Sequence, residues 1–407
     1  MNTPHRQSAG QFVAAVLTPR GRGAVATIRI QGDVHFSDSR PTMLFRPANG
    51  QPLHEQPLGR ICFGHWGQPV PEEVVVCRID ESTTELHCHG GDAAVRRIIN
   101  DLQSAGCAIQ TWQQLIAKTS CQFDAECRDV LTRATTLRTA EILLRQHAGV
   151  LKSALDELLQ FARTNPNGEQ SEFSESTDRS SRRDIAALQN EFIHRLDELL
   201  GWSNFGLHLS RPWNVVLAGR PNVGKSSLIN ALLGYSRSIV FDQPGTTRDV
   251  VTAETALNGW PIQFSDTAGI RKADDELESA GIDRAREQLR AADCQLILLD
   301  TSQPPHPDDH QLLSDWPDAV VVAHKCDLPN IWAGAIPPTA IPVSSLKETG
   351  IIVLADQLVG HLIPELPDSN SPIPISTRQV ELLTTTRAAA GRSNWSTCCE
   401  TLSHLLS

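Results

Sequence analysis

The N-terminal part of the chain contains short apolar runs separated by turn residues. The runs occupy residues 12–17, 24–30, 74–79 and 85–89, and 18–23 between the first two is rich in Gly, Pro and Arg. Short runs bounded in this way predict β-strands. From Asp92 onwards Ala94, Ile98 and Leu102 recur at helical spacing. The pattern predicts a compact α+β domain.

A helical pattern replaces the strands between residues 127 and 163 and returns over 184–200. The second stretch has an apolar stripe at Ile185, Leu188, Phe192, Leu196 and Leu199, which is typical of a core-facing helix. Between the two lies a polar segment, 165–183, which we expect to be a flexible loop. A last helical segment, 378–406, follows the linker 364–377 and is too short to be a domain, so we expect it to pack on an earlier part of the chain.

Strands and helices alternate between residues 213 and 364. The predicted strands are 215–218, 262–265, 295–299 and 319–323, and the predicted helices are 226–233, 284–291 and 351–362. This alternation predicts βαβ units and a mainly parallel sheet.

The composition argues against several classes of protein. The 407 residues carry 36 Lys+Arg against 47 Asp+Glu, a net charge of −11, which argues against coating nucleic acid by bulk charge. We find no apolar run long enough to span a bilayer and no apolar signal core near the start, so we expect a cytoplasmic protein. The ten cysteines form no Cys-x-x-Cys pair, and we expect reduced, mostly packed thiols.

The strongest chemical signal is the segment Gly219-Arg220-Pro221-Asn222-Val223-Gly224-Lys225-Ser226, which fits G-x-x-x-x-G-K-[ST] between a predicted strand and a predicted helix. Its glycines allow backbone N–H groups to face a phosphate, and the helix N-terminus adds positive potential. We expect Lys225 to reach the β- and γ-phosphates and the Ser226 hydroxyl to ligate Mg²⁺. The other residues of this loop expected to bind the nucleotide are Asn222, Val223, Gly224 and Ser227.

Four further motifs follow in the order that phosphoryl transfer requires. Thr246-Thr247, within Gly245–Asp249, offers a second hydroxyl for Mg²⁺, with Thr247 the better candidate. In Asp266-Thr267-Ala268-Gly269 the carboxylate can hold the metal through water, and the glycine N–H can contact the γ-phosphate.

The last two motifs select the base. His324-Lys325-Cys326-Asp327 resembles the guanine-binding Asn-Lys-x-Asp, whose carboxylate pairs with N1–H and the exocyclic amine of guanine. Ser344-Ser345-Leu346 lies where a backbone N–H would meet guanine O6. Because adenine cannot pair with that carboxylate, the motifs predict GTP rather than ATP. His324 replaces the usual Asn; it can still donate to guanine N7 or to the phosphate loop, so we expect weaker binding with selectivity retained through Asp327.

These segments resemble tRNA modification GTPases of the MnmE/TrmE family. The resemblance rests on 18–23, 28–30 and Glu85-Leu86-His87-Cys88-His89-Gly90-Gly91, and on 219–249, 266–271 and 278–282. It implies a multidomain α/β protein with an N-terminal α+β folate-binding and dimerising domain at 1–118. A discontinuous all-α helical domain, 119–211 and 375–407, would flank an inserted Ras-like P-loop GTPase domain at 212–366.

The resemblance also implies GTP hydrolysis stimulated by potassium. Asn222 matches a potassium-ligating Asn, and the loop that closes over the ion corresponds to 241–246. In this loop the resemblance implies that Phe241, Gln243 and Thr246 bind potassium and that Phe241 and Thr246 also bind GTP. A cation there would neutralise charge on the leaving phosphate. Glu278 matches the acidic residue that orients the attacking water, which makes Glu278, Lys225 and Asp266 the expected catalytic residues; by itself Glu278 would be a solvated helix charge.

For the N-terminal domain the resemblance implies a site for 5-formyltetrahydrofolate or a related folate. Arg29, Glu85 and Arg133 match its binding positions; an Arg can pair with the glutamate tail and a carboxylate with the pterin N–H groups. Without the resemblance, Arg29 and Glu85 would be ordinary edge-strand charges. His87 and His89 on alternate strand positions share one face but supply no complete metal ligand set.

As a whole, the resemblance implies a homodimer that works with an MnmG-type flavoprotein on the wobble uridine of tRNA, in a 5-carboxymethylaminomethyl-type modification. Family members carry a C-terminal Cys-x-Gly-Lys tail, whereas this sequence ends at Ser407 with Cys398-Cys399 and no Gly-Lys, and 118–133 lacks most of a family run. We therefore expect an intact GTPase part and an eroded modification apparatus. The alternative is a diverged GTPase switch that modifies no tRNA.

Overall fold

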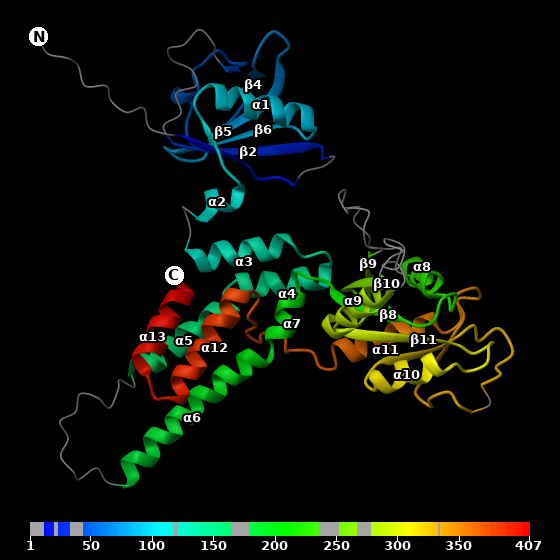
Figure 1. The fold of residues 1–407 in the computed structure, drawn as a ribbon. Helices are drawn as coiled ribbons and strands as arrows, with labels where there is room; N and C mark the ends of the chain where they lie inside the picture. The colour runs from blue at the N-terminus through cyan, green and yellow to red at the C-terminus, as the bar shows by residue number, and fades with distance from the viewer. Residues whose placement is uncertain are drawn as a thin grey trace, which may run out of the picture. The chain divides into compact units, whose positions relative to one another are not determined.

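The computed structural model describes residues 12–19, 23–32, 44–117, 121–164, 179–235, 252–266, 278–332 and 334–407, with the backbone alone for 179–185 and 278–284. The chain separates into two compact units, residues 1–125 and 126–407. Figure 1 shows strands and helices in both units. The three-part division by residue number stays a prediction, since helices and a second sheet share the second unit.

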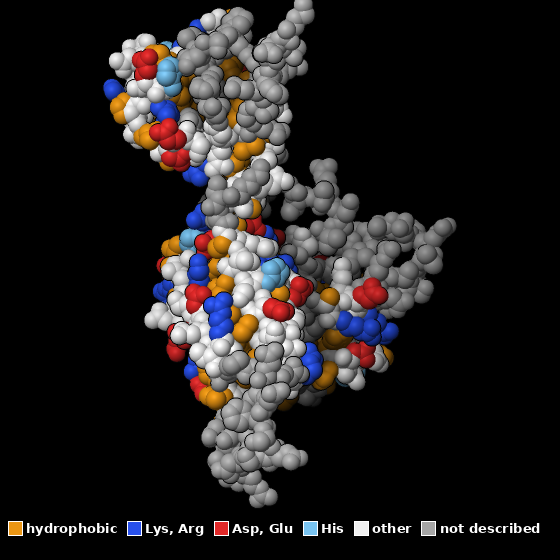
Figure 2. Space-filling model, turned by 90° about the vertical axis from the view of Figure 1, so that its left-hand side faces the viewer, with side chains coloured by type: hydrophobic (Ala, Val, Ile, Leu, Met, Phe, Trp, Pro, Cys, Tyr) orange, Lys and Arg blue, Asp and Glu red, His pale blue; other side chains and the backbone are white. Residues whose placement is uncertain are grey.

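The described surface is mixed in charge. On the face shown in Figure 2, basic and acidic side chains are interspersed with polar and apolar ones. Among the described residues, no helix is both long and apolar enough to cross a membrane. All ten cysteines are described, none is in a disulfide, and seven of them are buried.

The first unit is built on a seven-stranded sheet of order β3-β4-β5-β6-β2-β1-β7 within the described residues. Neighbouring strands are antiparallel except for the parallel pair β1 and β7. The strands are β1 Val13–Val16, β2 Val25–Gln31, β3 Phe45–Pro47, β4 Ile61–Trp66, β5 Glu72–Arg78, β6 Thr83–His89 and β7 Ala108–Ile109. The helices are α1 Asp92–Ser104, α2 Trp112–Ala117 and a 3-10 turn at Leu53–Glu55, while α3 Gln122–Thr132 crosses the boundary between the units.

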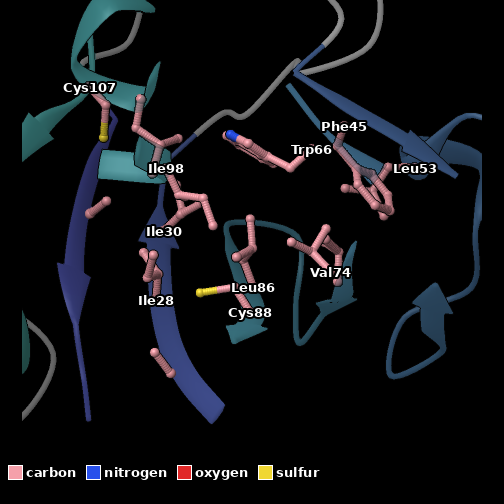
Figure 3. Close-up of a cluster of buried hydrophobic side chains, with 14 of the residues drawn as sticks. Ile28, Ile30, Phe45, Leu53, Trp66, Val74, Leu86, Cys88, Ile98 and Cys107 are labelled. Carbon is pink, nitrogen blue, oxygen red and sulfur yellow. The ribbon is translucent and has the colours of Figure 1, made fainter. Parts of the chain in front are cut away.

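One face of this sheet forms the core. Ile28 and Ile30 of β2 and Leu86 of β6 point toward Ile98 of α1, and all four are buried (Figure 3). Trp66 of β4 completes the cluster, and its indole N–H donates to Asp101 of α1 at 3.0 Å. Since side chains alternate along a strand, the residues between the buried ones lie on the opposite face of the sheet.

The second unit contains a helical bundle made from two distant parts of the sequence. Its helices are α4 Leu137–His147, α5 Val150–Thr164, α6 Arg179–Gly201, α7 Ser203–His208, α12 Thr377–Gly391 and α13 Trp395–Leu406. α13 packs on α5 and α12 on α6 (Figure 1). The rings of Phe161, Phe192 and Trp395, one from each of α5, α6 and α13, lie against one another, with Phe192 5.2 Å from Trp395. The expected packing of the C-terminal segment on earlier helices is confirmed.

Three helical predictions need correction. The expected loop 165–183 is wrong at its end, because α6 already begins at Arg179; residues 165–178 lie outside the described part. Leu188 of the expected stripe is 37% exposed, whereas Phe192, Leu196 and Leu199 are buried. The C-terminal segment is two helices rather than one: α12 ends after Gly391, and the Asn394 side chain caps α13 by accepting from the Thr397 N–H.

The other part of this unit is a six-stranded sheet, order β13-β12-β11-β8-β10-β9, parallel except for β9. Its strands are β8 Trp213–Ala218, β9 Thr252–Leu257, β10 Trp260–Asp266, β11 Cys294–Asp300, β12 Val320–His324 and β13 Ile341–Val343. The helices are α8 Lys225–Tyr235, α9 Glu278–Ala291, α10 Pro307–Asp315 and α11 Ile351–Leu362. α9 and α10 contribute to the apolar cluster on one face, while α8 and α11 contact each other and the sheet. The predicted mainly parallel α/β architecture is confirmed.

Candidate functional site

The loop between β8 and α8 has the backbone that a phosphate-binding loop requires. Gly219, Asn222 and Gly224 have positive φ values of 148°, 62° and 104°. A Cβ on Gly219 would lie 2.7 Å from the Leu298 carbonyl oxygen, and one on Gly224 would lie 2.5 Å from Cε1 of His324. Glycine is therefore required at both positions for conformation and for space.

Lys225 lies at the start of α8 and is 5% exposed. Its Nζ donates to the carbonyl oxygens of Gly219 at 2.9 Å and Arg220 at 3.2 Å, and it lies 3.9 Å from Oδ1 of Asp266. Two carbonyl oxygens of the loop and the nearby Asp266 carboxylate thus hold the ammonium in place. A phosphate held by this loop would meet a positive charge already in place.

Asp266 comes from a different strand but reaches the same place. It ends β10, which pairs in parallel with β8 so that Asp266 lies beside Leu217. Ser226 donates from Oγ to Oδ2 of Asp266 at 3.4 Å. A hydroxyl and a carboxylate are hard oxygen ligands of the kind Mg²⁺ takes, so this pair fits the metal that a bound triphosphate would bring. The structure brings together Lys225, Ser226 and Asp266, as expected.

The guanine-binding motif follows β12, the neighbour of β11. Lys325 has φ 61° and donates from Nζ to Asp300 at 2.6 Å and to the Asn222 carbonyl at 3.3 Å. This motif residue therefore supports the phosphate loop from the outside. Asp300 was missed by sequence reasoning; its only sequence signal is its place at the end of the apolar run 295–299.

Asp327 is exposed after Lys325 and is oriented by the next loop. The Ser344 hydroxyl donates to this carboxylate and holds its pKa below the ordinary value. Ser344 is fully buried, and its hydroxyl also accepts from the Lys347 N–H at 3.1 Å. Leu346, by contrast, is 81% exposed at the tip of this loop. The carboxylate is therefore ionised and available to pair with two N–H groups of a base.

The sequence allows His324 to bond either to guanine N7 or to the phosphate loop, and in the structure it bonds to the phosphate loop. The ring is 3% exposed; Nδ1 lies 2.7 Å from the Val223 carbonyl oxygen and Nε2 2.7 Å from the Ser345 hydroxyl. Burial lowers the pKa of His324, although the hydrogen bond to Val223 opposes this shift. A neutral imidazole therefore joins the loop after β8 to the loop after β13.

The remaining predicted residues of this site are outside what the structure describes. They are Phe241, Gln243, Thr246, Thr247, Thr267, Ala268 and Gly269. Glu278 is the first residue of α9, and its side chain is not described. Their roles stay predictions.

Comparison with known proteins identifies the chain's relatives. A family model described as 50S ribosome-binding GTPase matches residues 214–325, and one described as GTP-binding protein TrmE N-terminus matches 12–111. The tRNA modification GTPase MnmE of Geobacillus kaustophilus is 33% identical over 343 residues, which cover 78% of this chain and 73% of that protein. The namesake from a Synechococcus species is 32% identical over 409 residues, covering 94% of this chain and 87% of the relative.

The chain belongs to the MnmE family. It is accordingly a GTP-hydrolysing enzyme, and the predicted family resemblance is confirmed. Among solved structures, the G domain of the T. maritima FeoB iron transporter aligns with 38% of this chain and all of that chain, at 23% identity and a TM-score of 0.28.

The MnmE-type N-terminal unit carries the second candidate site on the face opposite its core. Arg29 of β2 donates through Nε at 3.1 Å and Nη2 at 2.6 Å to Oε1 of Glu85 on β6. Because β2 and β6 are interior neighbours in the sheet, these are not the edge-strand charges of the alternative interpretation. Both side chains are partly exposed, at 33% and 17%.

The histidines near this pair already have partners. His87 Nδ1 lies 3.0 Å from the Thr27 hydroxyl, and His89 Nδ1 lies 2.6 Å from Glu72. Among the residues that the structure describes, no group of three or more His, Cys, Asp or Glu side chains is placed to hold a metal. Arg133 belongs to the second unit, where it pairs with Asp129 one helical turn away. Its predicted contact with folate stays a prediction.

Proposed function

We propose that this MnmE-family GTPase uses GTP hydrolysis to drive the modification of the wobble uridine of tRNA. One observation carries the proposal: a single chain holds both a complete β8–α8 phosphate loop, with Lys225 and Asp266 in place, and a TrmE-type N-terminal unit with a partly exposed Arg29–Glu85 pair. The relatives that span most of the chain are named tRNA modification GTPases, which supports the same substrate.

In this proposal the chain's own residues hold the nucleotide while chemistry on the tRNA occurs elsewhere. Lys225 and the loop N–H groups bind the β- and γ-phosphates, and Ser226 with Asp266 holds Mg²⁺, which would neutralise phosphate charge. Asp327 selects guanine. Loss of the γ-phosphate would then change the conformation of the segments that contact it, and that change would reorganise the complex.

The N-terminal unit would supply folate and dimerisation. Glu85 would accept from the N–H groups of a pterin ring such as that of 5-formyltetrahydrofolate, and Arg29 would pair with a carboxylate of the ligand. We further propose a homodimer through this unit and an MnmG-type flavoprotein partner that performs the wobble-uridine chemistry. The net charge of −11 and the interspersed charges in Figure 2 suit a protein that reaches tRNA through such a complex.

Potassium would stimulate hydrolysis from a position beside the phosphate loop. Asn222 is exposed on this loop, and its backbone is in the left-handed conformation. An amide oxygen is a suitable ligand for a hard monovalent cation, and a cation here would act on charge that develops during phosphoryl transfer.

Deletion of the gene followed by nucleoside analysis of total tRNA tests the proposal. We expect loss of the modified wobble uridine, restoration by the wild-type gene and no restoration by Lys225→Ala. Arg286→Ala is the control, because Arg286 is also a cation of this unit but is exposed and lies 3.9 Å from Asp315. A nucleoside profile that is unchanged by deletion would refute the role in tRNA modification while leaving the GTPase activity standing.

A further inference from the structure

His324 occupies the position where a guanine-binding motif ordinarily has Asn, and both of its ring nitrogens already have partners in the protein. Nδ1 faces the Val223 carbonyl oxygen and Nε2 faces the Ser345 hydroxyl, each at 2.7 Å. The ring packs against Gly224, where even a Cβ would lie 2.8 Å from Nδ1. With 3% exposure, the imidazole has no room to turn toward a ligand without leaving both partners.

The hydrogen-bond donors of this side chain can be counted. A carbonyl oxygen only accepts, so Nδ1 must carry the proton that is donated to Val223. In the neutral ring Nε2 then accepts from the Ser345 hydroxyl; in the protonated ring Nε2–H donates to it. In either state no N–H of His324 is left for a base.

An Asn at this position would have one more N–H donor than the neutral His324 ring. Its amide has two N–H groups and an acceptor oxygen, so it can donate to the Val223 carbonyl, accept from Ser345 and still present one N–H to an acceptor on the base. The acceptor of guanine that this motif position would face is N7. Replacement of Asn by His therefore preserves the link between the two loops and removes the donor for N7.

We propose that this GTPase does not recognise guanine N7 and binds guanine only through the edge that carries N1–H, the 2-amino group and O6. Asp327 and the 344–346 segment make those contacts, while His324 is a positioning residue that fixes the loop after β13 against the phosphate loop. Guanine nucleotides with carbon in place of N7 are consequently ligands equal to the natural ones. This inference deepens the proposed function and rests on its guanine site.

Calorimetric titration of the full chain with GDP, 7-deaza-GDP and inosine diphosphate tests the inference. We expect wild-type dissociation constants for GDP and 7-deaza-GDP within about twofold of each other, because no hydrogen bond is lost. Inosine diphosphate lacks the 2-amino group and binds about tenfold more weakly or worse, since its loss leaves the Asp327 carboxylate short of a partner. In His324→Asn, 7-deaza-GDP binds about three- to tenfold more weakly than GDP, because the restored N–H now distinguishes the two.

Two results overturn the inference. One is wild-type protein that binds 7-deaza-GDP at least fivefold more weakly than GDP, and this comparison needs no variant to fold. The other is a His324→Asn variant that binds the two nucleotides equally, which would show that the lost donor is not the reason for tolerance. Failure of GDP itself to bind would overturn the guanine site and the proposed function as well, whereas selective loss of 7-deaza-GDP binding overturns this inference alone.

Discussion

Lys325 and Asp300 form an ion pair in which Nζ lies 2.6 Å from Oδ2, joining the loop after β12 to the end of β11. The pair exists because β11 and β12 are parallel and in a register that places Asp300 beside His324. Burial would raise the pKa of Asp300, but hydrogen bonds from Lys325 and Ser302 outweigh it and hold the pKa below the ordinary value. The same Lys325 reaches the Asn222 carbonyl, so the carboxylate indirectly supports the phosphate loop.

Asp300→Asn should therefore weaken both stability and nucleotide binding. We expect the free energy of unfolding to fall by about 1.5–3 kcal/mol, the range for a hydrogen bond to a charged group, and GDP to bind about tenfold more weakly. Denaturant unfolding and calorimetry measure the two effects. Ser302→Ala is the control: its hydroxyl donates to Oδ1 of Asp300 whereas Lys325 binds Oδ2, so this variant should leave GDP affinity nearly unchanged.

Acidification should destabilise the second unit through His324. The folded-state pKa lies below the ordinary value of 6.5, mainly through burial and also through Lys325, while the Val223 hydrogen bond, Asp300 and Asp327 oppose the shift. Below about pH 6.5 the unfolded chain takes up a proton that folded His324 resists, so the free energy of unfolding falls as pH is lowered. We expect denaturant unfolding of wild type to lose more stability between about pH 7.5 and 5.5 than His324→Asn does. Equal losses would contradict this assignment.

Potassium dependence can be tested at Asn222 without straining the loop. Because its φ is 62°, Asn222→Gly removes the side-chain oxygen and keeps the backbone conformation, while Asn222→Asp keeps an oxygen. We expect wild-type GTP hydrolysis to be faster in K⁺ than in Na⁺, the glycine variant to lose most of that difference and the aspartate variant to retain part of it. Equal wild-type rates in the two salts would exclude the role in potassium binding.

Folate binding should depend on Glu85 much more than on Glu72 of the adjacent strand. Glu85→Gln removes the charge that can take two pterin N–H groups, and we expect 5-formyltetrahydrofolate affinity to fall about tenfold or more. Glu72→Gln is matched in chemistry and lies on the adjacent β5, where Glu72 contacts His89. If equilibrium dialysis gives the two variants similar affinities for folate, the Arg29–Glu85 pair does not bind it.

Much of the nucleotide site was predictable from the sequence because its residues lie at the ends of apolar strands or just beyond the loops that follow them. The ends of parallel strands meet at one edge of a sheet, so Lys225, Asp266 and His324 converge once β8, β10 and β12 are in one sheet. The strand order itself was not needed for this prediction.

The sequence does not predict contacts that depend on strand register, nor which of two hydrogen-bond partners a side chain takes. Asp300 lies beside Lys325 because β11 pairs with β12, and no local sequence pattern encodes that pairing. His324 could bond to guanine N7 or to the phosphate loop, and the sequence does not show that the ring packs against Gly224 and faces the Val223 carbonyl. The early start of α6 at Arg179 was missed because its polar first turns lack the apolar spacing that marks a helix.

Steady-state phosphate release by the purified chain tests the central claim, hydrolysis of GTP at the Lys225–Asp266 site, most directly. We predict hydrolysis of GTP that excess GDP inhibits and excess ADP does not, and a decrease of at least about a hundredfold in Lys225→Ala, as for loss of a preorganised charge on a reacting phosphate. Lys152→Ala, on α5 of the helical bundle, should hydrolyse GTP at the wild-type rate. Equal inhibition by ADP, or full activity in Lys225→Ala, would contradict the account.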